Sequence, residues 1–388
     1  MSSEPTIPPD ERGRPQRLGG GLLLGLWLAL ALADGVAALL LPAEWYAFRE
    51  WELARSDQPA APFRRSFRFE SDRVSGDLAN LARAPLWRVF KRQIFTTDVR
   101  GLRNPGWRED SRARVIVLGD SLMVGSQVSD EDVFALRLGR ELNEPVYSFA
   151  GAEPLVALTH RYLKRLGAEV VVLGLGEATL RRLGDPGLAG EAAPLAREPE
   201  PLPDSRWGRF RRLDPARRFS DHLVGQARFS LGFRPPTVPY ADEETGMLFS
   251  GDALRAQRRH PPPQAIEQLA HQLAQLARVL GRRGLRTVLV LIPDKENVYA
   301  ERIPASLRGG ANAFLPGLTR QLVAARVPTL DLTPIFRGAA SSAGPELYFP
   351  DDTHWTPEAI RIAARHVAQS VRARPASTRA GSVGDEAR

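Results

Sequence analysis

The stretch VIVLGDSLMVG, from Val115 to Gly125, decides the expected fold. A run of β-branched and aliphatic residues, typical of a buried strand, ends at Gly119, and Asp120 and Ser121 follow at once. In an open parallel sheet, ligands bind beyond the carboxyl ends of the strands, which is where this serine would lie. A serine hydroxyl becomes a nucleophile only when an adjacent base accepts its proton. A reactive serine here therefore requires a histidine from elsewhere in the chain.

Aliphatic strands alternate with amphipathic helices on both sides of this stretch. Further strands are expected at 146–151, 169–176, 286–294 and 328–336, and helices at 132–143, 154–167, 265–284, 318–327 and 356–373. Continuous aliphatic strands separated by helices favour a parallel sheet that is covered on both faces. We expect one doubly wound α/β domain, a flavodoxin-like three-layer sandwich, over residues 112–372.

The N-terminal segment has the composition of a membrane anchor. Residues 1–18 are polar, and residues 19–42 are apolar with a single charge, Asp34. The apolar run is long enough to cross a bilayer, and the arginines before it favour a cytoplasmic N-terminus. The sequence predicts a single-pass signal anchor in the cytoplasmic membrane, with the body of the chain in the periplasm or outside the cell. A cleaved signal or a buried helix is the alternative.

Three further segments lie outside the alternating pattern. Residues 43–111 form an arginine-rich lead-in, which we expect to be extracytoplasmic and to pack on the edge of the domain. Residues 183–262 are rich in proline, arginine and glycine and are interpreted as an irregular insertion or partly ordered lid. Residues 373–388 are polar and predict a disordered tail.

Composition narrows the classes of function. The chain has 388 residues, no cysteine and a formal net charge of +8. Cysteine metal sites, disulfides and thiol nucleophiles are therefore excluded. Nearly all the positive charge is arginine, scattered without a nucleic-acid-binding motif, so we expect no nucleic acid partner. No pattern predicts a cofactor or a metal ion.

His354 is the best candidate for the base. The other five histidines lie within helical patterns or in the insertion: His160, His222, His260, His271 and His366. His354 lies in FPDDTHWTPEA, just before the last expected helix, where Thr356 would cap the helix and Pro357 would begin it. Asp351 and Asp352 precede the histidine, and either could orient its ring.

With GDSL after a strand and DTHW before the last helix, the chain resembles the SGNH (GDSL-type) hydrolase superfamily from about Arg114 to Arg372. The resemblance implies that Ser121 is the nucleophile and His354 its base. It also implies an oxyanion hole that includes the backbone N–H groups of Ser121 and of Gly151 in SFAGAEP.

Two segments, LIPDKENVYAERIP and DTHWTPEA, resemble the alginate O-acetyltransferase-like branch, whose anchored or exported members modify extracytoplasmic polysaccharides. In that branch the acid lies two residues before the histidine, which favours Asp352. The broader superfamily uses an offset of three residues, which makes Asp351 the alternative acid. The order of the motifs differs from that of the alginate enzymes, where the histidine motif comes first.

One position departs from the superfamily pattern. Its third block reads Gly-x-Asn-Asp, with the asparagine in the oxyanion hole, whereas this chain has GLGE with Gly176 at that place. Lys295 in PDKENVY and Glu177 are possible substrate contacts. For Lys295 an exposed loop position is the alternative, with positioning of the acid also open, and for Glu177 the alternative is a surface carboxylate.

Three functions remain open at this point. The first is an extracytoplasmic O-acyltransferase that places acetyl groups on a cell-envelope or exported polysaccharide. Its partners would be the polysaccharide acceptor, an acyl donor and a membrane-bound O-acyltransferase or envelope assembly proteins. The second is an ester hydrolase of the same fold. The third is a non-catalytic glycan-binding or assembly protein, which the missing asparagine favours.

Overall fold

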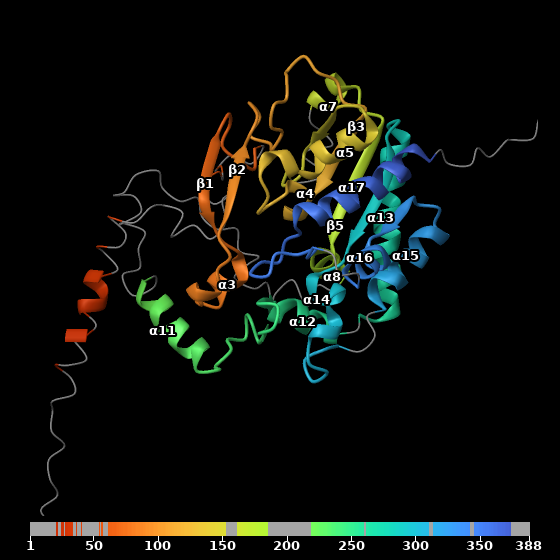
Figure 1. Ribbon diagram of the computed structural model, residues 1–388. Helices are drawn as coiled ribbons and strands as arrows, with labels where there is room; N and C mark the ends of the chain where they lie inside the picture. Colours follow the sequence, from red (N-terminus) through yellow and green to blue (C-terminus); the bar gives the residue numbers. More distant parts are fainter. Residues whose placement is uncertain are drawn as a thin grey trace, which may run out of the picture.

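A five-stranded parallel sheet forms the centre of the computed structural model (Figure 1). The structure describes residues 61–152, 161–184, 219–259, 261–309, 313–341 and 345–373, with scattered positions before residue 61. The strands are β3 (Val115–Gly119), β4 (Val146–Ser148), β5 (Val170–Gly176), β8 (Arg286–Ile292) and β9 (Thr329–Asp331). Their order is β4-β3-β5-β8-β9, which is the flavodoxin-like arrangement. The predicted three-layer α/β fold with a parallel sheet is confirmed.

Helices cover both faces of this sheet. One layer contains α5 (Phe134–Leu142) and α17 (Pro357–Arg372), and the other contains α7 (Arg161–Leu166), α13 (Pro263–Arg282) and α15 (Phe314–Ala324). Successive strand residues point to opposite faces, so Val117 packs in the first layer and Ile116 in the second. Because both sets are aliphatic, the strands are buried on both sides, as their continuous apolar runs predict.

Short helices follow four of the strands and gather at one edge of the sheet. They are α4 (Ser121–Val124) after β3, α8 (Glu177–Gly184) after β5, α14 (Lys295–Val298) after β8 and α16 (Thr333–Ala340) after β9. Single 3₁₀ turns are also present at η3 (Asp130–Asp132) and η4 (Ala300–Arg302). The strand expected over 328–336 is shorter than predicted, because the Asp331 carboxylate accepts a hydrogen bond from the Thr333 N–H and the chain turns into a helix there.

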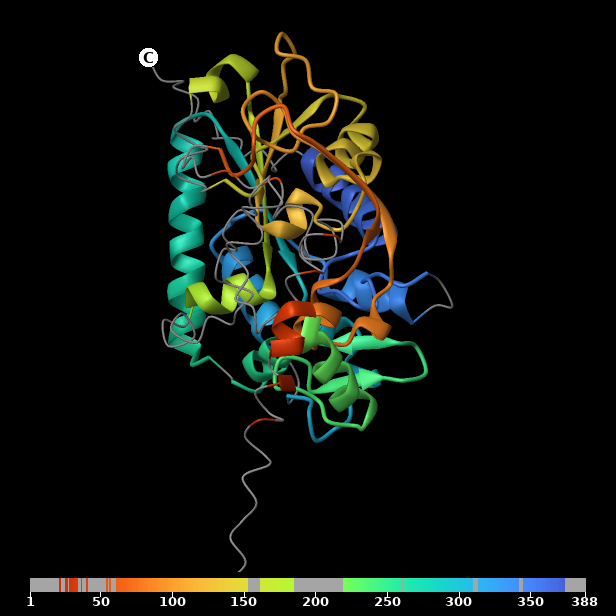
Figure 2. The same ribbon diagram turned by 90° about the vertical axis from the view of Figure 1, so that its left-hand side faces the viewer.

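The lead-in folds into its own small element before reaching the sheet. Strand β1 (Arg68–Val74) pairs with β2 (Lys91–Thr96) in antiparallel fashion, and between them lie α3 (Asp77–Leu81) and η2 (Pro85–Trp87). Figure 2 shows the β1–β2 pair running along the domain, with α3 close to the insertion. Thus the described lead-in is a folded part of the domain.

The described part of the insertion is more regular than its sequence predicts. It holds α11 (Phe219–Ser230), the antiparallel pair β6 (Tyr240–Asp242) and β7 (Met247–Phe249), and α12 (Gly251–Arg258). Leu78 of α3, Phe229 of α11 and Leu248 of β7 share a small core. Residues 219–259 therefore form an ordered part of the insertion, because these apolar residues pack on α3, a partner outside the insertion. Residues 185–218 lie outside the described residues.

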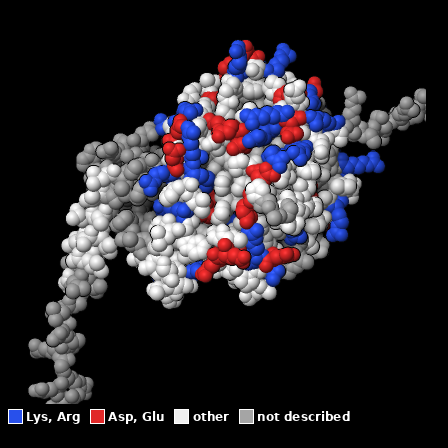
Figure 3. Space-filling model, viewed as in Figure 1, with Lys and Arg blue, Asp and Glu red and all other residues white. Residues whose placement is uncertain are grey.

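Within the described part of the chain, no helix is both long and apolar enough to cross a membrane. The expected anchor over 19–42 falls largely outside the described residues, as do residues 1–18 and the expected tail from residue 374. On the face seen in Figure 3, Lys and Arg side chains are interspersed with Asp and Glu side chains, so charges of both signs share that face.

Candidate active site

Ser121 is the first residue of α4, directly beyond the carboxyl end of β3. The glycine before the turn is required by space and by backbone conformation. Gly119 has φ of +149°, and a Cβ there would lie 2.2 Å from the Gly174 carbonyl oxygen of the neighbouring strand. The strand can therefore end abruptly and leave the serine at the edge of the sheet.

Asp120 of the GDS motif fixes the turn in place. Its Oδ1 accepts a hydrogen bond from the Leu122 N–H at 3.1 Å, which caps α4. Its Oδ2 accepts from the Gly176 N–H at 2.9 Å and from the Thr179 hydroxyl at 3.0 Å. The carboxylate thus ties the end of β3 to the end of β5, and Ser121 is held by two strands.

A chain of hydrogen bonds joins Ser121, His354 and Asp352. His354 Nε2 lies 2.9 Å from Ser121 Oγ, and His354 Nδ1 lies 2.5 Å from Asp352 Oδ1. Asp352 is completely buried and His354 is 5% exposed. The Thr356 cap and the helix start at Pro357 are as predicted. The geometry is that of a nucleophile, a base and an orienting acid.

The two aspartates before the histidine have different surroundings. Burial alone would raise the pKa of Asp352, but the electrostatic interaction and the hydrogen bond with His354 outweigh burial and lower that pKa below its ordinary value. The Asp351 carboxylate instead turns away and accepts hydrogen bonds from the N–H groups of Gly76 at 2.7 Å and Val89 at 2.9 Å. Burial raises the pKa of Asp351. Asp352, not Asp351, contacts the ring.

Lys295 holds the loop that carries the acid and the base. Its Nζ donates to the main-chain carbonyls of Phe349 and Pro350, both at 2.8 Å, and of Asp352 at 2.9 Å. Lys295 is 1% exposed, so the alternative of an exposed loop position is wrong. An ammonium has three N–H donors and all three are used within the protein, which leaves none for a substrate. The contacts match the positioning alternative.

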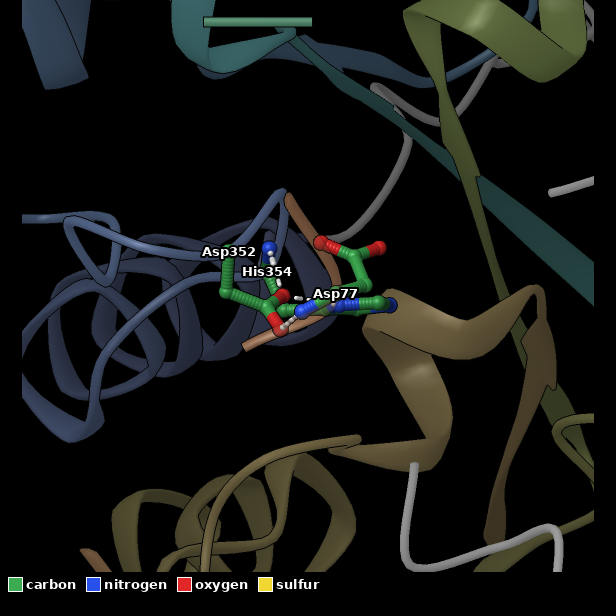
Figure 4. A group of neighbouring side chains, drawn as sticks. All are labelled: Asp77, Asp352 and His354. Carbon is green, nitrogen blue, oxygen red and sulfur yellow. Dashed lines mark hydrogen bonds and ion pairs between the residues drawn. The ribbon is translucent and has the colours of Figure 1, made fainter. Parts of the chain in front are cut away.

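Asp77, at the start of α3, lies against the same loop (Figure 4). Its backbone N–H donates to Asp352 Oδ2 at 2.7 Å, and its carboxylate accepts two hydrogen bonds from Thr353. One ligand atom from each of Asp77, Asp352 and His354 lies within 4.8 Å of the others. A metal ion would need atoms that these hydrogen bonds already use, so the cluster fits an acid–base pair better than a metal centre.

Of the two predicted oxyanion donors, Gly151 does not fit. Its N–H donates to the Gly119 carbonyl at 2.9 Å, because the chain turns back on the end of β3. Among the described residues, no acceptor pairs with the N–H of Ser121, which remains as a donor beside the hydroxyl. At Gly176 a Cβ would lie 3.0 Å from Asp120 Oδ2, so a larger residue there would require the Asp120 side chain to shift slightly.

Glu177 is part of the interior. Its Oε1 accepts from the Arg181 guanidinium at 2.8 and 2.9 Å, and its Oε2 accepts from the Asn297 amide at 2.8 Å. The side chain is completely buried, so both the substrate contact and the surface carboxylate expected for it are wrong. The residue joins α8 to α14 beneath the edge of the sheet.

Sequence reasoning missed Asp77. It lies 276 residues before its partner Thr353 and is followed by no recognisable motif. A lone aspartate at the start of a short helix is common, so no signal in the sequence marks this one. Only the folded lead-in brings it to the histidine loop.

Residues 244–383 match a family model described as the SGNH hydrolase-like domain of acetyltransferase AlgX. The resemblance to the SGNH hydrolases is confirmed. The matched segment contains Lys295, Asp352 and His354, whereas Ser121 lies before it. The acid–base pair and the serine are thus supplied by distant parts of the sequence.

The solved structures to which this chain is similar include a lipase/acylhydrolase from Enterococcus faecalis. The identity is 12% and the TM-score 0.32, and the match covers 66% of this chain and 95% of that one. Another is the salicylyl-acyltransferase SsfX3 from a tetracycline biosynthetic pathway, with 16% identity and a TM-score of 0.21, covering 62% of this chain and 59% of that one. No curated protein matches the sequence.

Proposed function

We propose that this protein is an extracytoplasmic O-acyltransferase that transfers acetyl groups to a cell-envelope or exported polysaccharide. The observation that carries the proposal is the hydrogen-bonded chain from Ser121 through His354 to Asp352. The match of residues 244–383 to an acetyltransferase family supports acyl transfer as the class of reaction.

The geometry suggests a two-step reaction. Ser121 Oγ attacks the carbonyl carbon of the acyl donor while His354 Nε2 accepts the hydroxyl proton, and Asp352 stabilises the imidazolium. We assign the Ser121 N–H as the donor that stabilises the negative charge developing on the carbonyl oxygen. The donor's alcohol leaves with the proton from His354. A sugar hydroxyl then attacks the acyl-serine and gives its proton to His354. The bond from the acyl carbon to Ser121 Oγ breaks, His354 returns the proton to Ser121 Oγ, and the ester product leaves.

The experiment that tests acyl transfer also distinguishes two other functions, ester hydrolysis and a non-catalytic role. With water in place of the sugar hydroxyl, the same side chains perform ester hydrolysis. A non-catalytic glycan-binding or assembly role is favoured by one observation: the N–H groups of Gly151 and Gly176 are engaged within the protein. Losing one oxyanion donor costs about 10²- to 10³-fold in rate, so the absence of other donors would matter.

The test uses the full-length protein in detergent with a chromogenic acetyl ester as donor and uronic-acid or neutral oligosaccharides as acceptors. We expect mass spectrometry to detect acetylated oligosaccharide, and we expect less free acetate when the acceptor is present than when it is absent. Ser121→Ala should abolish both products, and the exposed Ser341→Ala should change neither. Acetate without acetylated sugar would support the hydrolase. Binding of oligosaccharide with no acetyl product would support the non-catalytic role.

The location is a second part of the proposal. It rests on the apolar run over 19–42 and on the arginines before it, which favour a cytoplasmic N-terminus. Alkaline phosphatase fused after Arg372 should be active, and a cytoplasmic reporter at the same position should be inactive. The reverse pattern would contradict an extracytoplasmic domain.

A further inference from the structure

We propose that Asp77 is a positioning residue for the His354–Asp352 pair, so that the lead-in is part of the active site. The inference rests on the proposed function, because it assigns a role in the same acyl transfer. It is carried by the contacts between the start of α3 and the loop over 351–354 (Figure 4).

Asp77 holds the residue that links the acid to the base. Its Oδ1 accepts a hydrogen bond from the Thr353 N–H at 3.0 Å, and its Oδ2 accepts from the Thr353 hydroxyl at 2.9 Å. Its own N–H donates to Asp352 Oδ2 at 2.7 Å, while the other oxygen of Asp352 contacts His354. Asp77 therefore fixes the main chain between Asp352 and His354, and it also fixes the orientation of the Asp352 carboxylate.

The position of α3 leaves little freedom for this contact to change. The N–H groups of Gly76 and Leu78 donate to the side chain and the carbonyl of Asp351, at 2.7 and 3.0 Å. A Cβ at Gly76 would lie 2.1 Å from the Asp351 carbonyl oxygen, so only glycine allows this approach. The helix and the loop are therefore packed backbone against backbone, and Asp77 is carried to a fixed place.

Asp77 also places a buried carboxylate near the His354 ring. Asp77 is 1% exposed, and one of its carboxylate oxygens lies within 4.8 Å of a ring nitrogen of His354. A buried negative charge at that distance favours the imidazolium that forms when the serine loses its proton. Two carboxylates thus favour the imidazolium form of His354: Asp352 contacts the ring directly, and Asp77 lies close to it.

Other charged groups near the His354–Asp352 pair lie on β2, on α14, after η2 and on the histidine loop itself. Lys91 of β2 and Lys295 of α14 are close enough to influence the pKa of a loop aspartate, and Asp351 lies on the loop itself. Arg88, after η2, interacts with Asp351. Asp77 also acts on the pKa of Lys295, so the exposed Asp72→Asn variant is needed as a control for the loss of a carboxylate charge.

The first experiment compares Asp77→Asn with Asp72→Asn in the full-length protein. Asp72 is an exposed aspartate of β1 and serves as the control. We expect Asp77→Asn to lower kcat by about 10²-fold, the effect of a small misplacement of reacting groups, with little change in KM. The acid limb of the kcat/KM profile should move to lower pH by about half a unit or more, because the imidazolium loses a nearby negative charge. Asp72→Asn should change neither quantity.

The second experiment tests whether Asp77 acts through Thr353. In a double-mutant cycle of Asp77→Asn and Thr353→Val, the combined loss in kcat should be close to the larger single loss, since both changes break the same contact. Thr353→Ser, which keeps the hydroxyl, should restore most of the activity. Independent losses that multiply would overturn the proposed route through Thr353.

The third measurement needs no turnover and so separates this inference from the proposed function. NMR titration of His354 should show a lower pKa in Asp77→Asn than in the wild-type protein, with Asp72→Asn unchanged. An inactive wild-type protein that shows this shift would reject acyl transfer and keep the positioning role. An unchanged His354 titration in a folded Asp77→Asn variant, together with unchanged kcat, would overturn the inference.

Discussion

The indole Nε1 of Trp355 donates a hydrogen bond to the main-chain carbonyl of Leu122 at 2.9 Å. This bond joins the loop of His354 to the first turn of α4, where Ser121 lies. Trp355 is completely buried and stacks near Phe134 of α5. The serine and the histidine are therefore attached to one packed core, and their spacing does not depend on closure of a surface loop.

Replacing the two aspartates should have unequal effects. Asp352→Asn removes the carboxylate that accepts the His354 Nδ1–H, and we expect turnover to fall by about 10⁴-fold. Asp351→Asn should change turnover by less than about tenfold, because its carboxylate faces Gly76 and Val89. Steady-state kinetics of both variants with an acetyl ester measures the difference. The opposite ranking would make Asp351 the acid.

Lys295→Met should lower kcat without preventing substrate binding. The variant loses three hydrogen bonds to the carbonyls of the histidine loop, and a displacement of about 1 Å costs on the order of 10²-fold in rate. Lys164→Met, on the exposed face of α7, is the matched control and should behave like the wild type. A folded Lys295→Met variant with wild-type kcat would show that the loop keeps its geometry without this ammonium.

Glu177→Ala should reduce stability far more than it affects the chemistry. Breaking a buried ion pair costs about 3–5 kcal/mol, and Arg181 would keep its charge in the interior. The partly exposed pair of Glu358 and Arg361 offers a control, where Glu358→Ala should cost about 0.5 kcal/mol or less. Urea unfolding gives both values. Equal losses would mean that the Glu177 pair is not effectively buried.

The buried Glu296 should make the free energy of unfolding depend on pH near neutrality. Burial raises its pKa from 4.5 to about 7, so between these values the folded state binds more protons than the unfolded state. The free energy of unfolding should therefore fall as pH rises through this window. Relative to the wild type, Glu296→Gln should lose this part of the slope, whereas the exposed Glu301→Gln should keep it. If the free energy of unfolding of Glu296→Gln depended on pH as steeply as that of the wild type, Glu296 would not have a raised pKa.

The sequence predicts the sheet and three residues of the site because those features are local. Strands such as β3 are continuous aliphatic runs, GDS follows directly, and the sequence around His354 contains its own cap and acid. These patterns need no long-range contact to be recognised. Together with the resemblance to a family, they predict which residues meet at the edge of the sheet.

The rest depends on contacts between distant segments. Asp77 reaches the site because α3 packs on the histidine loop, and the described part of the insertion packs against the lead-in through Phe229 and Leu78. Gly151 was expected to donate to an oxyanion, but its N–H is used by Gly119 within a turn whose geometry the residue types do not specify. Burial of Lys295 and Glu177 likewise depends on which helices surround the end of each strand.

The central claim is that Ser121 carries the acyl group. The most direct measurement is to mix the full-length protein with an activated acetyl ester, quench with acid and map the modified peptide by mass spectrometry. We predict an acetyl group on Ser121, absent from Ser121→Ala and retained in Ser341→Ala. Ester turnover with no acetyl group on Ser121, or with the group on another residue, would contradict the account.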